Sequence, residues 1–63
     1  MRENLKKART EAGLTQKEVA RCADITERCY QYYENGDKTP TVDIAIKIAR
    51  TLGNTVENLF GTN

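Results

Sequence analysis

The sequence contains no histidine, no tryptophan and only two cysteines, Cys22 and Cys29. A structural zinc site normally takes four Cys or His ligands, so the chain cannot supply one by itself. One disulfide is formally possible, but nothing else indicates secretion, and we expect free thiols and no metal or cofactor. Since histidine, a glycine-rich phosphate loop and a nucleophile with a plausible base are all missing, we do not expect an enzyme.

Long apolar runs are also absent. None approaches the roughly 18 residues that span a membrane, and no stretch of signal-peptide type follows the N-terminus, so we expect a soluble, cytoplasmic protein. Proline occurs once and glycine four times in 63 residues, which indicates a folded domain and not a disordered one. A chain this short forms one domain at most and needs idealised helix packing, or a second copy, for extra stability.

An excess of one charge is missing as well. Ten Lys and Arg residues stand against nine Asp and Glu residues, giving a net charge of +1. Many nucleic-acid binders are strongly basic, so composition alone does not indicate DNA. If the chain binds DNA, folding must place its charges on different faces.

What the sequence does contain is a series of helix-length intervals without strict apolar/polar alternation, which predicts no strands. The capping box Thr15–Glu18 and the N-cap residues Thr26 and Thr41 predict helix starts. An apolar stripe of Leu5, Ala8 and Ala12 marks the first helix, and the fourth is apolar nearly all round, which predicts burial on more than one side. The predicted helices cover about residues 3–12, 15–23, 26–34, 42–52 and a short segment after Thr55.

Only three or four residues separate the second and third helices, so these helices must cross steeply, as a helix-turn-helix requires. At about 100° per residue, the third helix has two distinct sides. One side carries Tyr30, Tyr33 and Glu34, and the other carries Arg28, Gln31, Tyr32 and Asn35. Because the more apolar side belongs inward, the second side is expected to face solvent or a DNA groove.

Five sequence elements occur in a characteristic order. They are Leu14-Thr15-Gln16-x-x-Val19-Ala20, Ile25-Thr26, Glu34-Asn35-Gly36, Pro40-Thr41-Val42-Asp43-x-Ala45-Ile46-Lys47-Ile48-Ala49-x-x-Leu52-Gly53 and Glu57-Asn58-Leu59-Phe60. With these elements the chain resembles the phage repressor and Cro-type (xenobiotic-response-element-like) helix-turn-helix family of transcriptional regulators over residues 5–60. The resemblance implies an all-α, compact five-helix, lambda-repressor-like DNA-binding domain, with the helix-turn-helix at about residues 16–35.

The sequence departs from the family pattern at Asp24, where the family usually has glycine in the turn. The turn needs a left-handed residue, and Asp is among the non-glycine residues that tolerate this conformation best. We therefore expect the same turn with a small local strain.

The resemblance implies that the third helix contacts DNA bases, and its outward residues are the candidates: Glu27, Arg28, Gln31 and Tyr32. Arg28 can bind guanine O6 and N7 together, and Gln31 can bind adenine or a phosphate. Three of these residues also have a plainer interpretation: Arg28 as a solvated surface residue, Tyr32 as a packing residue, and Glu27 as a charge that favours the helix N-terminus.

The expected phosphate contacts come from the start of helix two, the start of helix three and the loop that follows: Gln16, Lys17, Thr26, Asn35, Lys38 and Thr39. The family resemblance implies that Gln16 anchors a phosphate, and Lys38 is the only cation in the loop. Lys17 could equally be solvated. The resemblance further implies a structural ion pair between Arg9 and Glu34.

Taken together, we expect a sequence-specific regulator of prokaryotic or phage origin, acting as a repressor. A homodimer would bind an inverted repeat of double-stranded DNA, with half-sites about 34–36 Å apart. The candidate dimer residues are Ile44, Val56, Leu59 and Phe60, although the same side chains could simply close the core. Two alternatives stay open: an antitoxin-like protein-interaction module, or the DNA-binding domain of a longer regulator that continues beyond Asn63. No small-molecule ligand is indicated.

Overall fold

A computed structural model describes residues 1–61 of the chain. Within this range the fold is all-α and contains no strand, as predicted. The elements are α1 (Glu3–Glu11), α2 (Gln16–Cys22), α3 (Glu27–Asn35), α4 (Val42–Leu52) and η1 (Glu57–Gly61). The predicted fifth helix is present, but it has the wider π-helical hydrogen bonding. No helix within residues 1–61 is long and apolar enough to cross a membrane.

Threonine side chains fix the starts of three helices, as their positions in the sequence predict. Thr15, Thr26 and Thr41 each accept, through Oγ1, the backbone N–H three residues further on. The Thr15 N–H in turn donates to the Glu18 carboxylate at 2.8 Å, which completes the capping box. Each cap provides a partner for a backbone donor that the first helical turn leaves unpaired.

The core takes its largest fully buried side chains one from each α-helix: Leu5, Val19, Tyr30 and Ile48. Leu59 of η1 packs against them at 3 % exposure. Two details of the predicted core are wrong. Ala12 is exposed because it is the C-cap of α1, beyond the last helical turn. Val42, in the first turn of α4, is 72 % exposed, so α4 is not covered all round.

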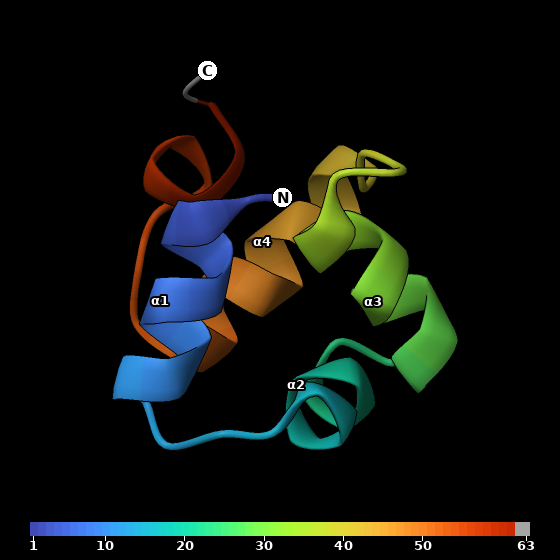
Figure 1. Ribbon diagram of the computed structural model, residues 1–63, viewed down its shortest axis with the longest axis horizontal. Helices are drawn as coiled ribbons and strands as arrows, with labels where there is room; N and C mark the ends of the chain where they lie inside the picture. Colours follow the sequence, from blue (N-terminus) through green and yellow to red (C-terminus); the bar gives the residue numbers. More distant parts are fainter. Residues whose placement is uncertain (62–63) are drawn as a thin grey trace.

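The arrangement places α3 along one outer edge of the molecule, with α2 beside it and α1 and η1 on the far side (Figure 1). The chain passes from α2 to α3 through Asp24, whose φ of 60° confirms the predicted left-handed turn. The turn is tied to α2 because the Ile25 N–H donates to the Ala20 carbonyl at 2.9 Å. These two helices pack directly on each other, which fixes the direction in which the outer surface of α3 points.

Candidate nucleic-acid interface

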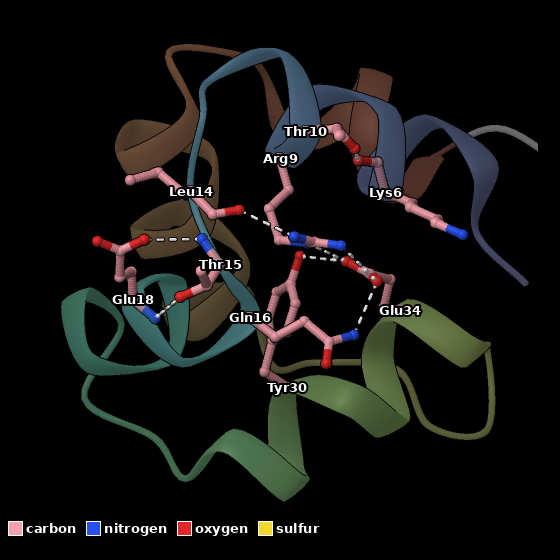
Figure 2. A network of polar contacts seen from close by, with 9 residues as sticks. All are labelled: Lys6, Arg9, Thr10, Leu14, Thr15, Gln16, Glu18, Tyr30 and Glu34. Atoms are coloured by element: carbon pink, nitrogen blue, oxygen red, sulfur yellow. Dashed lines mark hydrogen bonds and ion pairs between the residues drawn. The ribbon is translucent and has the colours of Figure 1, made fainter.

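The inner side of α3 is organised around the carboxylate of Glu34, which is 2 % exposed. Arg9 of α1 donates to it through Nε at 2.8 Å and through Nη2 at 3.3 Å. Gln16 of α2 donates through Nε2 at 2.9 Å, and the Tyr30 hydroxyl donates at 2.9 Å. We call these four residues the Glu34 network (Figure 2). The ion pair expected between Arg9 and Glu34 is therefore present.

The Glu34 network keeps a buried carboxylate charged. Burial opposes ionisation, but the hydrogen bonds from Arg9, Gln16 and Tyr30 together outweigh it and lower the pKa of Glu34 below 4.5. Burial, followed by the hydrogen bond to Glu34, raises the pKa of Tyr30, so its hydroxyl remains a donor. Arg9 also donates through Nη1 to the Leu14 carbonyl at 2.8 Å. The Glu34 carboxylate thus joins α1, α2 and α3.

The opposite side of α3, formed by Glu27, Arg28, Gln31 and Tyr32, is the outer face. Glu27 and Arg28 are exposed, while Gln31 and Tyr32 are half-buried. On the inner side, Tyr30 is 0 % and Tyr33 6 % exposed. The predicted orientation of α3 is therefore correct. Exposure is graded along the outer face, and it is greatest in the first helical turn.

The structure brings a residue of the outer face together with a residue of the α3–α4 loop, which comprises residues 36–41. The Lys38 ammonium lies 4.7 Å from the centroid of the Tyr32 ring. The Asp37 N–H donates to the Tyr32 carbonyl at 2.9 Å, and the Lys38 N–H donates to the same carbonyl at 3.4 Å. A predicted base contact and a predicted phosphate contact therefore form one local unit.

The remaining phosphate candidates lie in different surroundings. Lys17, Asn35 and Thr39 are exposed. Thr26 is exposed too, and its hydroxyl accepts the Cys29 N–H while keeping its own proton to donate. Gln16 is half-buried, and its amide nitrogen is engaged with Glu34, so it has a structural role that the sequence did not indicate.

Charge along residues 16–39 is nearly balanced. Residues 16–39 carry four Lys or Arg residues and five Asp or Glu residues. Glu34 is buried and paired, which leaves four of each sign on the segment. Folding thus removes one acid of this segment from the surface.

Sequence reasoning missed Arg2, which lies close to this balanced segment in space. Its guanidinium donates to the Lys38 carbonyl at 2.9 Å and to Thr39 Oγ1 at 3.1 Å. One indirect signal was available, because the last turn of α3 contains no basic residue that could interact with its C-terminal carbonyls. The sequence does not indicate which cation would lie there.

One of the dimer candidates is ruled out by burial. Leu59 belongs to the core, so its side chain is not available to a second copy, and its assignment to a dimer surface is corrected. Ile44, Val56 and Phe60 are half-buried and pack against that core from outside.

Both cysteines are free thiols. Cys22 is exposed, and the Cys29 Sγ lies 3.2 Å from the Tyr33 hydroxyl. Among residues 1–61, no group of His, Cys, Asp and Glu side chains could hold a metal ion.

Comparison with known proteins places this geometry in context. The helix-turn-helix family model matches residues 5–59 of the chain. An HTH-type transcriptional regulator of Bacillus subtilis, YqaF, is 47 % identical over 53 residues, covering 84 % of this chain and 70 % of the relative. An HTH-type transcriptional regulator of Methanothermobacter thermautotrophicus is 36 % identical over 61 residues, covering 95 % and 88 %. One of Archaeoglobus fulgidus is 32 % identical over 60 residues, covering 95 % and 86 %.

Proposed function

The chain belongs to the helix-turn-helix family, and on that premise we propose that it is a sequence-specific DNA-binding transcriptional regulator. In this proposal α3 enters the major groove of double-stranded DNA in the cytoplasm, and binding represses transcription. A protein helix fits this groove, where each base pair presents a distinct set of donors and acceptors.

The orientation of α3 carries the proposal. Its inner side is closed by Tyr30, Tyr33 and the Glu34 network, whereas Arg28 projects from the first exposed turn. The N-terminal part of the second helix of such a motif contacts base edges, and Arg28 and Glu27 occupy that part. Arg28 can donate two hydrogen bonds to guanine, while Gln31 and Tyr32 follow on the same face.

Phosphate contacts on either side of α3 would fix its register on the duplex. We assign them to Lys17 and Thr26 near the turn and to Asn35, Lys38 and Thr39 beyond the end of α3. Gln16 joins them through its carboxamide, held in place by Glu34. With few cations on this surface, we expect few displaced counterions and a shallow dependence of affinity on salt.

We further propose a homodimer, because one copy is too small for two half-sites. The chain extends 25 Å along its longest axis, whereas successive half-sites lie about 34–36 Å apart. Ile44, Val56 and Phe60 are the proposed contact residues, since each is only half-buried in a single copy.

A second candidate function is an antitoxin-like module that binds another protein, with DNA binding secondary. The observation that favours it is exposed apolar surface on α4, where Val42 is 72 % and Ile46 36 % exposed. Val42 and Ile46 are four positions apart in the sequence, so they lie on the same side of the helix.

Selection from a random pool of DNA duplexes tests the proposal. We expect enrichment of an inverted repeat whose half-site centres are separated by about one helical turn. Arg28→Ala, selected in parallel, should lose the preference at one position of each half-site. Recovery of no preferred sequence by the wild-type chain would contradict the proposal and favour the protein-binding alternative.

A further inference from the structure

The C-terminal end of α3 is stabilised by a residue that precedes α1 in the sequence. Helix C-termini leave carbonyl groups unpaired and favour nearby cations, yet the last turn of α3 contains no basic residue. Arg2 fills this role. Its backbone N–H donates to the Glu34 carbonyl at 2.8 Å, and its guanidinium Nη1 donates to the Tyr33 carbonyl.

The same guanidinium also binds the α3–α4 loop. Nη1 donates to the Lys38 carbonyl at 2.9 Å, and Nη2 donates to Thr39 Oγ1 at 3.1 Å. One planar group therefore connects the end of α3 to the two loop residues that carry the proposed phosphate contacts. The Phe60 ring also lies next to the guanidinium, with 5.5 Å between Arg2 Cζ and the ring centroid.

These contacts determine what the loop can present to DNA. The Thr39 hydroxyl accepts from Arg2, so its own proton is left to donate to another acceptor. The Lys38 backbone is held on both sides, by Arg2 at its carbonyl and by the Tyr32 carbonyl at its N–H. Its ammonium, held near the Tyr32 ring, is thereby kept on the side of the loop next to the outer face.

From this geometry we propose that Arg2 is a positioning residue for DNA binding. It fixes Lys38 and Thr39 against the end of α3 so that both meet the sugar-phosphate backbone while α3 lies in the groove. The proposal rests on the proposed DNA-binding function and adds a residue that is distant in sequence from the helix-turn-helix. Arginine is required because a lysine ammonium lacks the planar set of donors that reaches three acceptors at once.

The first experiment measures positioning in the free protein. Arg2→Lys retains the charge and removes the fork of donors, so amide hydrogen exchange at Asp37 and Lys38 should accelerate relative to wild type. Exchange at Val19, in the core of α2, should stay unchanged. Arg50→Lys is the matched control, because Arg50 is exposed in the last turn of α4. Equal exchange rates in wild type and Arg2→Lys would overturn the positioning role.

The second experiment measures affinity for the selected duplex, well below the melting temperature of each variant. We expect Arg2→Lys to weaken binding to matched and mismatched duplexes alike, by roughly tenfold. The slope of log affinity against log salt should become shallower by about 0.9 for each phosphate that is no longer neutralised. In a Lys38→Met/Thr39→Val background the same change should have little further effect, since Arg2 acts through those residues. A purely structural residue would show no such dependence on the background.

The outcomes separate the two proposals. If the wild-type chain binds no DNA sequence, the proposed function and the role of Arg2 both fall. If the wild-type chain binds and Arg2→Lys binds equally well, only the role of Arg2 is overturned. Equal losses of affinity in the wild-type and Lys38→Met/Thr39→Val backgrounds would also overturn it.

Discussion

The two sides of α3 use polar residues in opposite ways. On the inner side, the Glu34 carboxylate binds Arg9, Gln16 and Tyr30, and no buried side-chain nitrogen or oxygen within residues 1–61 lacks a partner. On the outer face, the Arg28 side chain is exposed. The inner side therefore determines stability, and the outer face leaves its donors available to a ligand. Substitutions on the two sides should separate these properties.

Glu34→Ala should have the largest effect. It leaves the Arg9 guanidinium, whose side chain is 14 % exposed, without its carboxylate, and breaking a buried pair costs about 3–5 kcal/mol. A domain of 63 residues has a total stability of about 3–9 kcal/mol, so this loss removes a large share of it and should lower the urea midpoint markedly. Urea denaturation followed by circular dichroism measures the loss. Arg28→Ala is the matched control on the outer face and should change stability by less than about 0.5 kcal/mol.

The pH dependence of stability isolates the charge on Glu34. The pKa of Glu34 is lowered from 4.5 in the folded chain, so the charged carboxylate stabilises the fold at pH values above 4.5. This contribution is lost as the pH falls through the pKa of the folded state. Glu34→Gln removes this titration while keeping a side chain of similar shape. We expect the difference in unfolding free energy between wild type and Glu34→Gln to shrink between pH 6 and pH 3. A constant difference across this interval would show that Glu34 acts without its charge.

Arg28→Ala tests the outer face as a source of specificity. Loss of a bidentate contact to guanine should reduce discrimination at one base position by about 1–3 kcal/mol, with little change in affinity for unrelated DNA. Competition binding with duplexes substituted at each operator position measures this. A uniform loss across all positions would instead show that Arg28 contacts phosphate.

Lys38→Ala should give the complementary result with a smaller effect. Its ammonium contributes charge and no base recognition, so affinity should fall by a similar factor for every sequence. The slope of log affinity against log salt should become shallower by about 1 per copy. Asp37→Asn, at the neighbouring loop position, serves as a control that changes charge in the other direction. A change in the base preference of Lys38→Ala would contradict its assignment to the backbone.

Local patterns predicted most of the fold, because the forces behind them act over a few residues. The threonine caps and the angular positions of residues around α3 depend on sequence spacing alone. The caps correctly predicted three helix starts, and the angular positions correctly predicted the burial of Tyr30 and Tyr33. The π-helical bonding of η1 was not predictable, since apolar spacing does not define the hydrogen-bond register of so short a segment. Val42 shows a related limit: an apolar residue in a helix pattern does not reveal whether another element covers it.

Contacts between distant segments were predictable only where the family resemblance supplied them. The pair of Arg9 and Glu34 came from the resemblance and is present. The bond from Gln16 to the same carboxylate joins residues 18 positions apart, and nothing in the local pattern indicates it. Arg2 reaches Thr39 across 37 positions, although both residues appear as ordinary polar surface in the sequence. Long polar side chains have many rotamers, and only the assembled fold selects one.

Substitution of Asp24, in the turn between α2 and α3, should have the smallest effect on stability. Asp24 has a φ of 60°, a conformation that costs a non-glycine residue about 1–2 kcal/mol. Glycine removes this cost but loses more entropy on folding, so Asp24→Gly should stabilise the chain by less than about 1 kcal/mol. Asp24→Asn removes the same charge and still tolerates the conformation. A gain in DNA affinity shared by both variants therefore reflects the lost charge. A melting temperature raised only in Asp24→Gly reflects backbone strain. Asp24→Ala should be the least stable of the three, and if it equals Asp24→Gly, the turn relaxes to another conformation and α3 does not depend on it.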